Sequence, residues 1–193
     1  MAKELVSFLG ERAATSDNLS PEALEEVLQS KLEELASCEQ TVEKLKWSDG
    51  MQFYVPNALQ ERAHKSMARM VLFCGGNRSG KSTFGAMEIC FHLTRKYPIW
   101  YPMEKRYNRP VRVVVSATEF PIVTRVIEPK IAQYLPRDYY RMERSQKYLS
   151  RIVCKDGSSA DILTSEMKDE AYESADWDVA WMDEPQQKRK FQA

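Results

Sequence analysis

From residue 75 to residue 83 the chain reads Gly75-Gly76-Asn77-Arg78-Ser79-Gly80-Lys81-Ser82-Thr83. The first eight residues match the phosphate-binding pattern G-x-x-x-x-G-K-[ST]. An apolar run over residues 70–74 precedes the match and predicts a buried strand, and the helix-compatible residues 83–90 follow it. A strand, this loop and a helix in succession are the setting that the motif requires. The alternative is a glycine-rich turn that carries Lys-Ser by chance, and the flanking residues favour the phosphate loop.

The loop suits a nucleotide because phosphate oxygens need several hydrogen-bond donors at once. Glycines let the backbone turn its N–H groups inward around an anion, and the following helix adds the partial positive charge of its N-terminus. In this motif Lys81 reaches the β- and γ-phosphates, and the Ser82 hydroxyl ligates Mg²⁺. We therefore expect ATP and Mg²⁺ as cofactors, bound by residues 75–83.

A second motif predicts the hydrolytic half of the site: the apolar run 179–182 followed by Asp183 and Glu184. A strand there delivers Asp183 to the carboxyl edge of a sheet, where open α/β sheets bind ligands. Hydrolysis needs a metal-associated carboxylate and a group that orients water, so we assign Asp183 to the Mg²⁺ shell and Glu184 to the general base. The alternative is a solvated strand end. A glutamate beside the aspartate favours an ATPase of the additional-strand type over a nucleotide kinase.

The predicted fold is therefore an α/β P-loop NTPase of the additional-strand type, with a mainly parallel sheet flanked by helices, in residues 47–193. Residues 1–46 are predicted to form a helical appendage. The further predicted elements are helices over 2–14, 21–45, 57–67 and 123–135 (the last containing Pro129), a linker over 47–56, a buried parallel strand over 111–116, and a β-hairpin of 148–154 and 160–164. The helix over 21–45 carries one apolar stripe, which either packs on its own domain or docks a partner or neighbouring subunit.

The composition excludes several classes of protein. The formal net charge is zero, so a nucleic-acid surface would have to be a local patch. The four cysteines form no C-x-x-C pair and only two histidines accompany them, which argues against a zinc site and favours a reducing compartment. The N-terminus differs from a signal peptide, and no apolar run approaches the ~18 residues of a membrane span. We expect a cytosolic protein with no membrane contact.

The phosphate loop, with Asn-Arg-Ser between its glycines, resembles that of large terminase subunits, the DNA-packaging motors of tailed bacteriophages. Further parts of the resemblance are Pro56-Asn57-Ala58-Leu59-Gln60 followed by His64, and, downstream, Lys155-Asp156-Gly157-Ser158, Tyr172-Glu173-Ser174, Trp177-Asp178-Val179 and Trp181-Met182-Asp183-Glu184. The resemblance covers residues 50–185 and none of residues 1–45.

The resemblance implies a motor of the host-cell cytoplasm that couples Mg-ATP hydrolysis to translocation of double-stranded DNA into a procapsid. It also implies that Gln60 recognises the adenine edge, for which an exposed helical glutamine is the alternative, and that Tyr54 packs on the base. Arg78 would sense or stabilise the γ-phosphate in cis, since a guanidinium fork suits phosphate geometry, or would bind DNA or a neighbouring subunit. The implied partners are the portal, the small terminase subunit and further copies of the chain in a ring, and the state of the isolated chain, including a monomer, is left open.

The sequence departs from the family's pattern in two places. Residues 170–176 contain no arginine, although such motors often have one there, so the arginine finger expected from an adjacent subunit is not identified. The sequence also ends soon after Glu184, before the coupling strand and the nuclease domain of RNase H type that family members have. We therefore expect a truncated ATPase portion without nuclease activity.

Two runs mix basic and aromatic side chains and are candidates for tracking a DNA backbone. They are residues 101–112, with Lys105, Arg106, Arg109 and Arg112, and residues 137–151, with Arg137, Arg141, Arg144, Lys147 and Arg151. A solvated basic face and a subunit contact are the alternatives. For the chain as a whole, the competing functions are a nucleotide or small-molecule kinase and a nucleotide-gated binding module in which Asp183 and Glu184 are structural.

Overall fold

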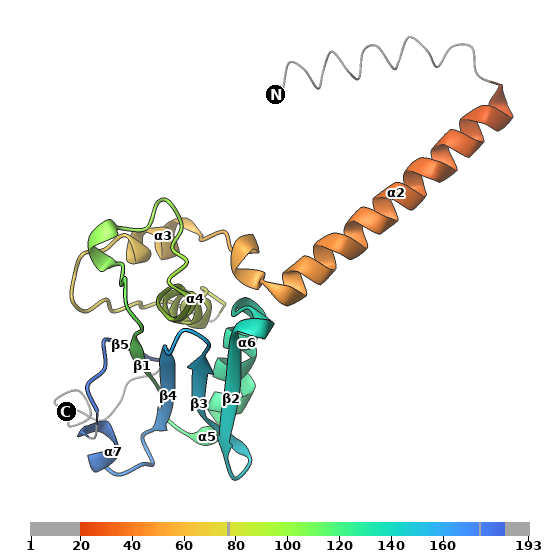
Figure 1. Ribbon diagram of the computed structural model, residues 1–193. Helices are drawn as coiled ribbons and strands as arrows, with labels where there is room; N and C mark the ends of the chain where they lie inside the picture. The colour runs from red at the N-terminus through yellow and green to blue at the C-terminus, as the bar shows by residue number, and fades with distance from the viewer. Residues whose placement is uncertain (1–19, 77, 174, 184–193) are drawn as a thin grey trace. The chain divides into compact units, whose positions relative to one another are not determined.

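The computed structural model describes residues 20–76, 78–173 and 175–183. The chain divides into two compact units, residues 1–45 and 46–193. Helix α2 (Pro21–Ser48) begins with a proline, which the first helical position tolerates because its missing N–H has no partner within the helix (Figure 1). The predicted long helix is confirmed, and what its apolar stripe packs against stays a prediction. The helix predicted over residues 2–14 lies outside the described residues.

The second unit is built on a five-stranded sheet in the order β2-β3-β4-β1-β5 (Figure 1). The strands are β1 (Arg112–Ala117), β2 (Tyr140–Ser145), β3 (Tyr148–Cys154), β4 (Ser159–Thr164) and β5 (Val179–Met182). Strand β1 pairs in parallel with β4 and β5, whereas β2, β3 and β4 pair antiparallel. The α/β architecture agrees with the prediction, but the expected mainly parallel sheet is wrong. The sheet is mixed because tight turns join β2 to β3 and β3 to β4, and such turns impose antiparallel pairing.

Four strands of the sheet are predicted by the sequence, because apolar or β-branched residues cluster in them: β1, β3, β4 and β5. Val113, Val114 and Val115 of β1 are buried, as expected of a central strand that is covered on both faces. The predicted strand before Asp183 is β5, and the predicted hairpin is the pair β3 and β4. Strand β2 was not predicted. It lies at the edge of the sheet and has exposed arginines, Arg141 and Arg144, between half-buried residues, so its apolar signal is weak.

Helices cover the sheet and its margins (Figure 1). They are α3 (Ala58–His64), α4 (Lys81–Thr94), α5 (Phe120–Ile122), the π-helical η4 (Val123–Ile127), α6 (Glu128–Tyr134) and α7 (Glu170–Glu173), with short 3-10 turns η2 (Gly50–Phe53), η3 (Met103–Lys105) and η5 (Arg137–Tyr139). The stretch from α5 to α6 is the predicted helix over 123–135. Its π turn ends at Ile127, two residues before Pro129, which lacks the N–H that a regular helix would use.

The main core lies between one face of the sheet and the helices α4, η4 and α6. Its buried members come from every layer: Ala86, Ile89, Cys90 and Leu93 of α4, Val123, Ile127 and Ile131 of η4 and α6, and Val113, Val115, Ile152, Ile162 and Trp181 of the sheet. A smaller cluster of Val114, Leu163 and Tyr172 covers the opposite face near α7. A third cluster of Met87, Phe91 and Tyr101 packs on the outer side of α4. Helix α4 is therefore enclosed by protein on two sides, which fixes the helix that follows the phosphate loop.

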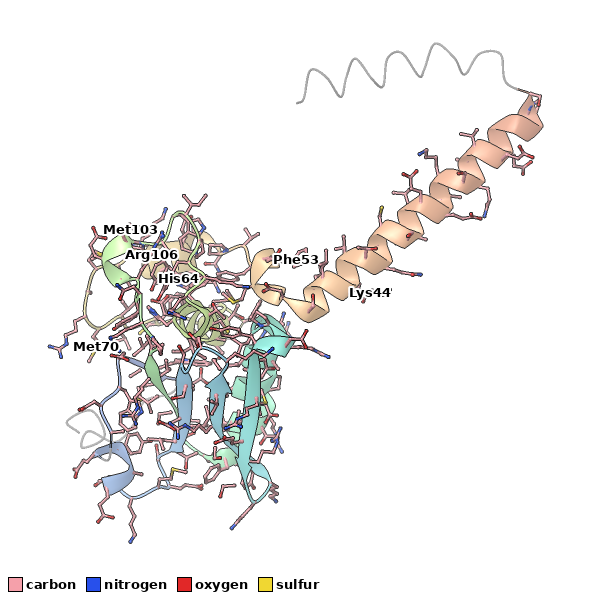
Figure 2. All side chains as sticks on the ribbon, viewed as in Figure 1. Lys44, Phe53, His64, Met70, Met103 and Arg106 are labelled. Atoms are coloured by element: carbon pink, nitrogen blue, oxygen red, sulfur yellow. The ribbon has the colours of Figure 1, made fainter. Side chains whose placement is uncertain are left out.

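The apolar residues 70–74 form no strand, so the predicted buried strand before the loop is wrong. Met70, labelled in Figure 2, is 75% exposed, and Leu72 is 86% exposed. A strand needs a neighbour for its backbone N–H and C=O groups, and among the described residues β5 pairs only with β1. Phe73 is the member of the run that packs, stacking on Phe84 of α4 with ring centroids 5.0 Å apart. In the part of the chain that the structure describes, no helix is long and apolar enough to cross a membrane.

Candidate nucleotide-binding site

The phosphate loop follows a sharply turned path that its glycines permit. Gly80 is the N-cap of α4 with a φ of 85°, a left-handed conformation that glycine adopts without strain. Arg78 also has a positive φ, of 63°. The Ser79 N–H donates to the Gly76 carbonyl (3.3 Å), and the Phe84 N–H donates to the Gly80 carbonyl (2.9 Å). A loop that turns in this way directly before a helix gathers backbone N–H groups at the positive end of the helix dipole.

Lys81 reaches across the loop from the first position of α4. Its ammonium donates to the carbonyls of Gly75 (2.7 Å) and Gly76 (2.9 Å). A Cβ on Gly75 would lie 2.6 Å from Ser79 Oγ, whereas a Cβ on Gly76 would meet nothing within 4 Å. Among the described residues Ser79 Oγ is buried without a hydrogen-bond partner. The loop therefore presents the Lys81 ammonium and the Ser79 hydroxyl, and both are groups that can donate hydrogen bonds to phosphate oxygens.

The strand that precedes Asp183 lies against the helix that begins at Lys81. A Cβ on Gly85, one turn into α4, would lie 2.2 Å from both Cε2 and Nε1 of Trp181. Trp181 belongs to β5, and the Asp183 N–H donates to the Ser116 carbonyl (3.0 Å), which extends the β1–β5 ladder by one residue. The contact between Gly85 and Trp181 thus joins the two motifs that the sequence places about a hundred residues apart.

Gln60 is buried behind the loop, with 4% of its surface exposed. Its Oε1 accepts from the Asn57 N–H (2.9 Å), and its Nε2 donates to the Gly80 carbonyl (3.0 Å). The exposed helical glutamine considered above is thus wrong, because the side chain packs between the start of α3 and the end of the loop. Adenine recognition by Gln60 stays a prediction.

Tyr54 lies within an aromatic cluster next to α3. Its hydroxyl is 3.0 Å from His64 Nε2, and its ring meets Phe91 and Tyr134 with centroids 6.2 and 6.0 Å apart. Burial, with smaller contributions from Tyr134 and Glu88, raises the pKa of the Tyr54 hydroxyl well above its ordinary value. The hydroxyl therefore stays protonated. The predicted packing of Tyr54 on a base is not tested by these contacts.

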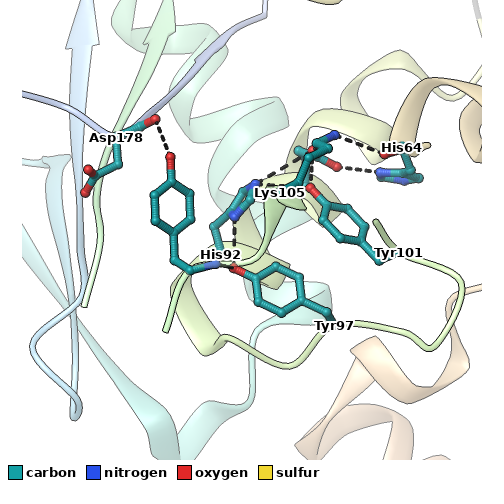
Figure 3. A network of polar contacts seen from close by, with 8 residues as sticks. His64, His92, Tyr97, Tyr101, Lys105 and Asp178 are labelled. Carbon is teal, nitrogen blue, oxygen red and sulfur yellow. Dashed lines mark hydrogen bonds and ion pairs between the residues drawn. The ribbon is translucent and has the colours of Figure 1, made fainter. Parts of the chain in front are cut away.

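A polar network that includes His64, Tyr101 and Lys105, all labelled in Figure 3, surrounds Glu88 of α4. Glu88 Oε2 lies 2.5 Å from His64 Nδ1, and Oε1 accepts from the Tyr101 hydroxyl (2.6 Å) and the Lys105 ammonium (2.9 Å). The Tyr101 hydroxyl is also 3.2 Å from His92 Nε2. These contacts tie α4 to the end of α3 and to the loop that contains Tyr101 and Lys105.

The electrostatics of this network keep the Glu88 carboxylate ionised. Burial alone would raise the pKa of Glu88, but hydrogen bonds from His64 and His92 and the charge of Lys105 outweigh it and hold the pKa far below its ordinary value. Burial, reinforced by Glu88, raises the pKa of the Tyr101 hydroxyl. Because a carboxylate only accepts hydrogen bonds, His64 donates through Nδ1, which leaves Nε2 to accept from Tyr54 when the imidazole is neutral.

The remaining predicted site residues are placed as follows. Ser82 and Thr83 lie in the first turn of α4 and are half-buried, and Thr83 shares a side-chain hydrogen bond with Tyr134. Arg78 is exposed on the loop. Asn77 and Glu184 lie outside the described residues, so their predicted roles stay predictions.

The basic residues of the loop before β1 are largely engaged within the protein. Arg106 donates to the carbonyls of Pro98 (3.0 Å), Ile99 (3.2 Å) and Tyr101 (2.6 Å). Arg109 donates to both carboxylate oxygens of Asp178, whose pKa this pairing lowers. In the second basic run, ion pairs join Arg141 to Glu143, Arg144 to Glu128 and Arg151 to Asp161. Contact of either run with DNA stays a prediction, and the first run has a structural task of its own.

Gly85 and Glu88 were not singled out from the sequence, and Trp181 was noted only as part of the resemblance to the family. A glycine inside a helical pattern is a signal for close packing, and Gly85 is such a residue. Glu88 is the acidic residue of α4 and lies between the apolar residues Met87 and Ile89, which signals a paired buried charge. The identity of the partners depends on segments distant in the sequence and has no local signal.

Comparison with known proteins places the chain in a family. No curated protein matches it. The family model described as terminase large subunit, T4likevirus-type, N-terminal, matches residues 72–193. The matched residues include the whole phosphate loop and every strand of the described sheet, but not α3. Because the match spans more than half of the chain, this protein belongs to the family of T4-like-virus-type large terminase subunits, as an N-terminal portion.

Proposed function

We propose that this chain is the ATPase motor portion of a packaging terminase, with a P-loop fold of the additional-strand type, that couples Mg-ATP hydrolysis to translocation of double-stranded DNA into a procapsid. Membership of the family supports a role in genome packaging in general. The observation that carries the finer proposal is the contact between Gly85 and Trp181. It joins the helix that follows the phosphate loop to the strand that precedes Asp183.

The loop has the properties that a nucleotide's phosphates require. Gly75 leaves room that a Cβ would fill, and Ser79 Oγ is buried without a partner among the described residues. Among the described residues the Lys81 ammonium donates to carbonyl oxygens, which a phosphate oxygen outcompetes because it carries a full negative charge. These features support a triphosphate site at the start of α4.

Bound Mg-ATP supplies the γ-phosphoryl group and the divalent charge that neutralises it. In the proposed site the loop N–H groups and Lys81 hold the β- and γ-phosphates, and Ser82 and Asp183 hold the metal ion. Glu184 orients a water molecule and takes its proton at a carboxylate oxygen. Arg78 stabilises charge on the transferred group from its exposed place on the loop. Portal, small terminase subunit and further copies of the chain are the partners that family membership suggests.

The first test measures nucleotide binding to the full chain by calorimetry with ATP and ADP in the presence of Mg²⁺. Lys81→Ala should abolish binding, whereas Lys155→Ala, which removes an exposed lysine at the β3–β4 turn, should leave it unchanged. Asp183→Asn should remove the Mg²⁺ dependence. If wild-type chain binds neither nucleotide, the ATPase proposal is wrong.

The second test follows phosphate release. Glu184→Gln should bind ATP normally and slow hydrolysis by about 10²–10⁴-fold, the usual contribution of a general base. Normal hydrolysis by Glu184→Gln would show that the assigned base is wrong, and transfer of phosphate to an acceptor other than water would indicate a kinase. Stimulation of the ATPase by double-stranded DNA should fall as salt rises, because backbone binding releases counterions. An ATPase indifferent to DNA at low salt would refute the coupling.

A further inference from the structure

Helix α2 carries an apolar stripe along most of its length. Val27, Leu28, Leu32, Leu35 and Val42 are between 41% and 62% exposed. In the part of the chain that the structure describes, no residue of α2 belongs to a hydrophobic core cluster. Helices in proteins gain most of their stability by packing an apolar face, so a helix of 28 residues with this stripe needs a surface to pack against.

The stripe repeats every seven residues, which is the period of a two-stranded coiled coil. Steps of seven separate the residues at the first seam position, a, which are Leu28, Leu35 and Val42. The second seam position, d, lies three residues further on and is occupied by Lys31, Cys38 and Leu45. A polar residue in such a seam restricts how two helices can align, and Lys31 is that residue here.

A parallel second copy of α2 would bring like charges together. In a parallel pair equal seam positions face each other, so Lys31 would meet Lys31 of the second copy inside the seam. The same alignment places Glu34, at position g, beside Glu39 of the second copy, at position e of the next heptad. Two ammonium groups in the seam and two carboxylate pairs along its rim disfavour this alignment.

An antiparallel second copy removes these conflicts from the seam. In an antiparallel pair each a residue faces a d residue, so Lys31 meets Val42 of the second copy and Cys38 meets Leu35. The aliphatic stem of Lys31 can pack on Val42 while its ammonium reaches solvent at the rim. Every layer of the seam then contains at least one aliphatic residue, and no two charges face each other.

The charges on the rim also favour the antiparallel alignment. It brings Glu25 of each copy beside Lys46 of the other, since both residues occupy position e. Lys46 lies over the Phe53 ring, 5.8 Å from its centroid, and has no ion-pair partner among the described residues. Other acidic residues occupy positions b or f, on the far side of the helix from the seam: Glu26, Glu33 and Glu43. The acidic character of α2 therefore does not oppose this pairing.

We propose that α2 is a dimerisation surface, through which two copies of this chain pair as an antiparallel two-stranded coiled coil. The contact is isologous, because the same face of both copies takes part, and it therefore closes on two copies. It is independent of the nucleotide site proposed above, because no residue of α2 belongs to that site.

Sedimentation equilibrium of the full chain tests the dimer. The wild type should associate to a dimer as its concentration rises. Leu35→Glu places one carboxylate from each copy in the seam and should weaken the dimer at least about 100-fold. Gln40→Glu is the matched control, because it introduces the same residue at position f of the same helix, and it should leave the dimer unchanged. Circular dichroism should show equal helix content in both variants at concentrations where the wild type is a dimer.

A wild type that stays monomeric at every soluble concentration would overturn the proposal. That result would indicate that the stripe packs on its own chain or on a different protein. Equal weakening of the dimer by Leu35→Glu and Gln40→Glu would also overturn it, because the contact would then not lie along the seam.

Disulfide cross-linking tests the orientation. Cys38→Ala and Cys74→Ser first remove the exposed thiols among the described residues. Glu25→Cys and Lys46→Cys are then made as separate chains, and each is oxidised alone and after mixing. A cross-linked dimer should form only in the mixture, because an antiparallel pair separates the two copies of residue 25 by about 35 Å along the helix axis. Cross-links within either variant alone, as a parallel pair produces, would overturn the antiparallel dimer.

Discussion

Replacement of Gly85 by alanine sets two opposing effects on stability against each other. Inside a helix the change normally stabilises a protein by about 1 kcal/mol, because glycine loses more backbone entropy on folding. Here the added Cβ would lie 2.2 Å from Cε2 and Nε1 and 2.8 Å from Cδ1 of Trp181, which is itself 9% exposed. Overpacking of this kind costs typically about 1–3 kcal/mol, and the buried indole has little room to move. We expect a net destabilisation of up to about 2 kcal/mol.

Urea unfolding of the full chain, followed by far-ultraviolet circular dichroism, measures this effect. A double-mutant cycle with Trp181→Leu isolates the contact, because leucine lacks the ring atoms that the new methyl group meets. In the Trp181→Leu background, Gly85→Ala should be neutral or stabilising. In the wild-type background it should also weaken nucleotide binding, because α4 must shift relative to β5. Stabilisation of the wild type by about 1 kcal/mol would refute the close packing of the two motifs.

Two further predictions concern buried polar groups. Glu88→Gln should destabilise the protein by about 1–3 kcal/mol at pH 7, since Lys105 loses its carboxylate partner. The folded-state pKa of Glu88 is depressed, so its contribution is complete above the unfolded value of about 4.3 and is lost as the pH falls below it. The difference between variant and wild type in urea unfolding should therefore shrink from pH 7 to pH 3, and a constant difference would contradict the ionised network. Ser116→Ala should cost about 1–2 kcal/mol by removing the 2.6 Å hydrogen bond to the Tyr172 hydroxyl, and a thermal melt equal to that of the wild type would count against this bond.

Local patterns were sufficient for much of the fold. The helix after the phosphate loop, the buried strand β1, the hairpin of β3 and β4, and the strand before Asp183 all follow from residues that are neighbours in sequence. Helix periodicity, β-branched runs and turn residues act over a few positions, so they need no knowledge of distant segments. The glycines of the phosphate loop belong to the same class, since the positive φ of Gly80 is a local requirement.

Two errors arose where a strand depends on its neighbours. Residues 70–74 have the apolar composition of a buried strand, yet they pair with no described strand. Strand β2 has the composition of an exposed basic run, yet it pairs with β3 along its length. Strand formation requires a partner for each backbone group, and composition records only how a side chain suits a sheet face.

In the candidate site, too, some features follow from the sequence and others depend on tertiary packing. The sequence predicts which residues bind phosphate and metal, because that prediction rests on the chemistry of Lys81, Ser82 and Asp183 themselves. The use of Gln60 was decided by folding, since its amide lies between Asn57 and the Gly80 carbonyl. The junction of the two motifs through Gly85 and Trp181 was also decided by folding. Residue chemistry can be read along a chain, whereas distances between remote segments exist only once the core has packed.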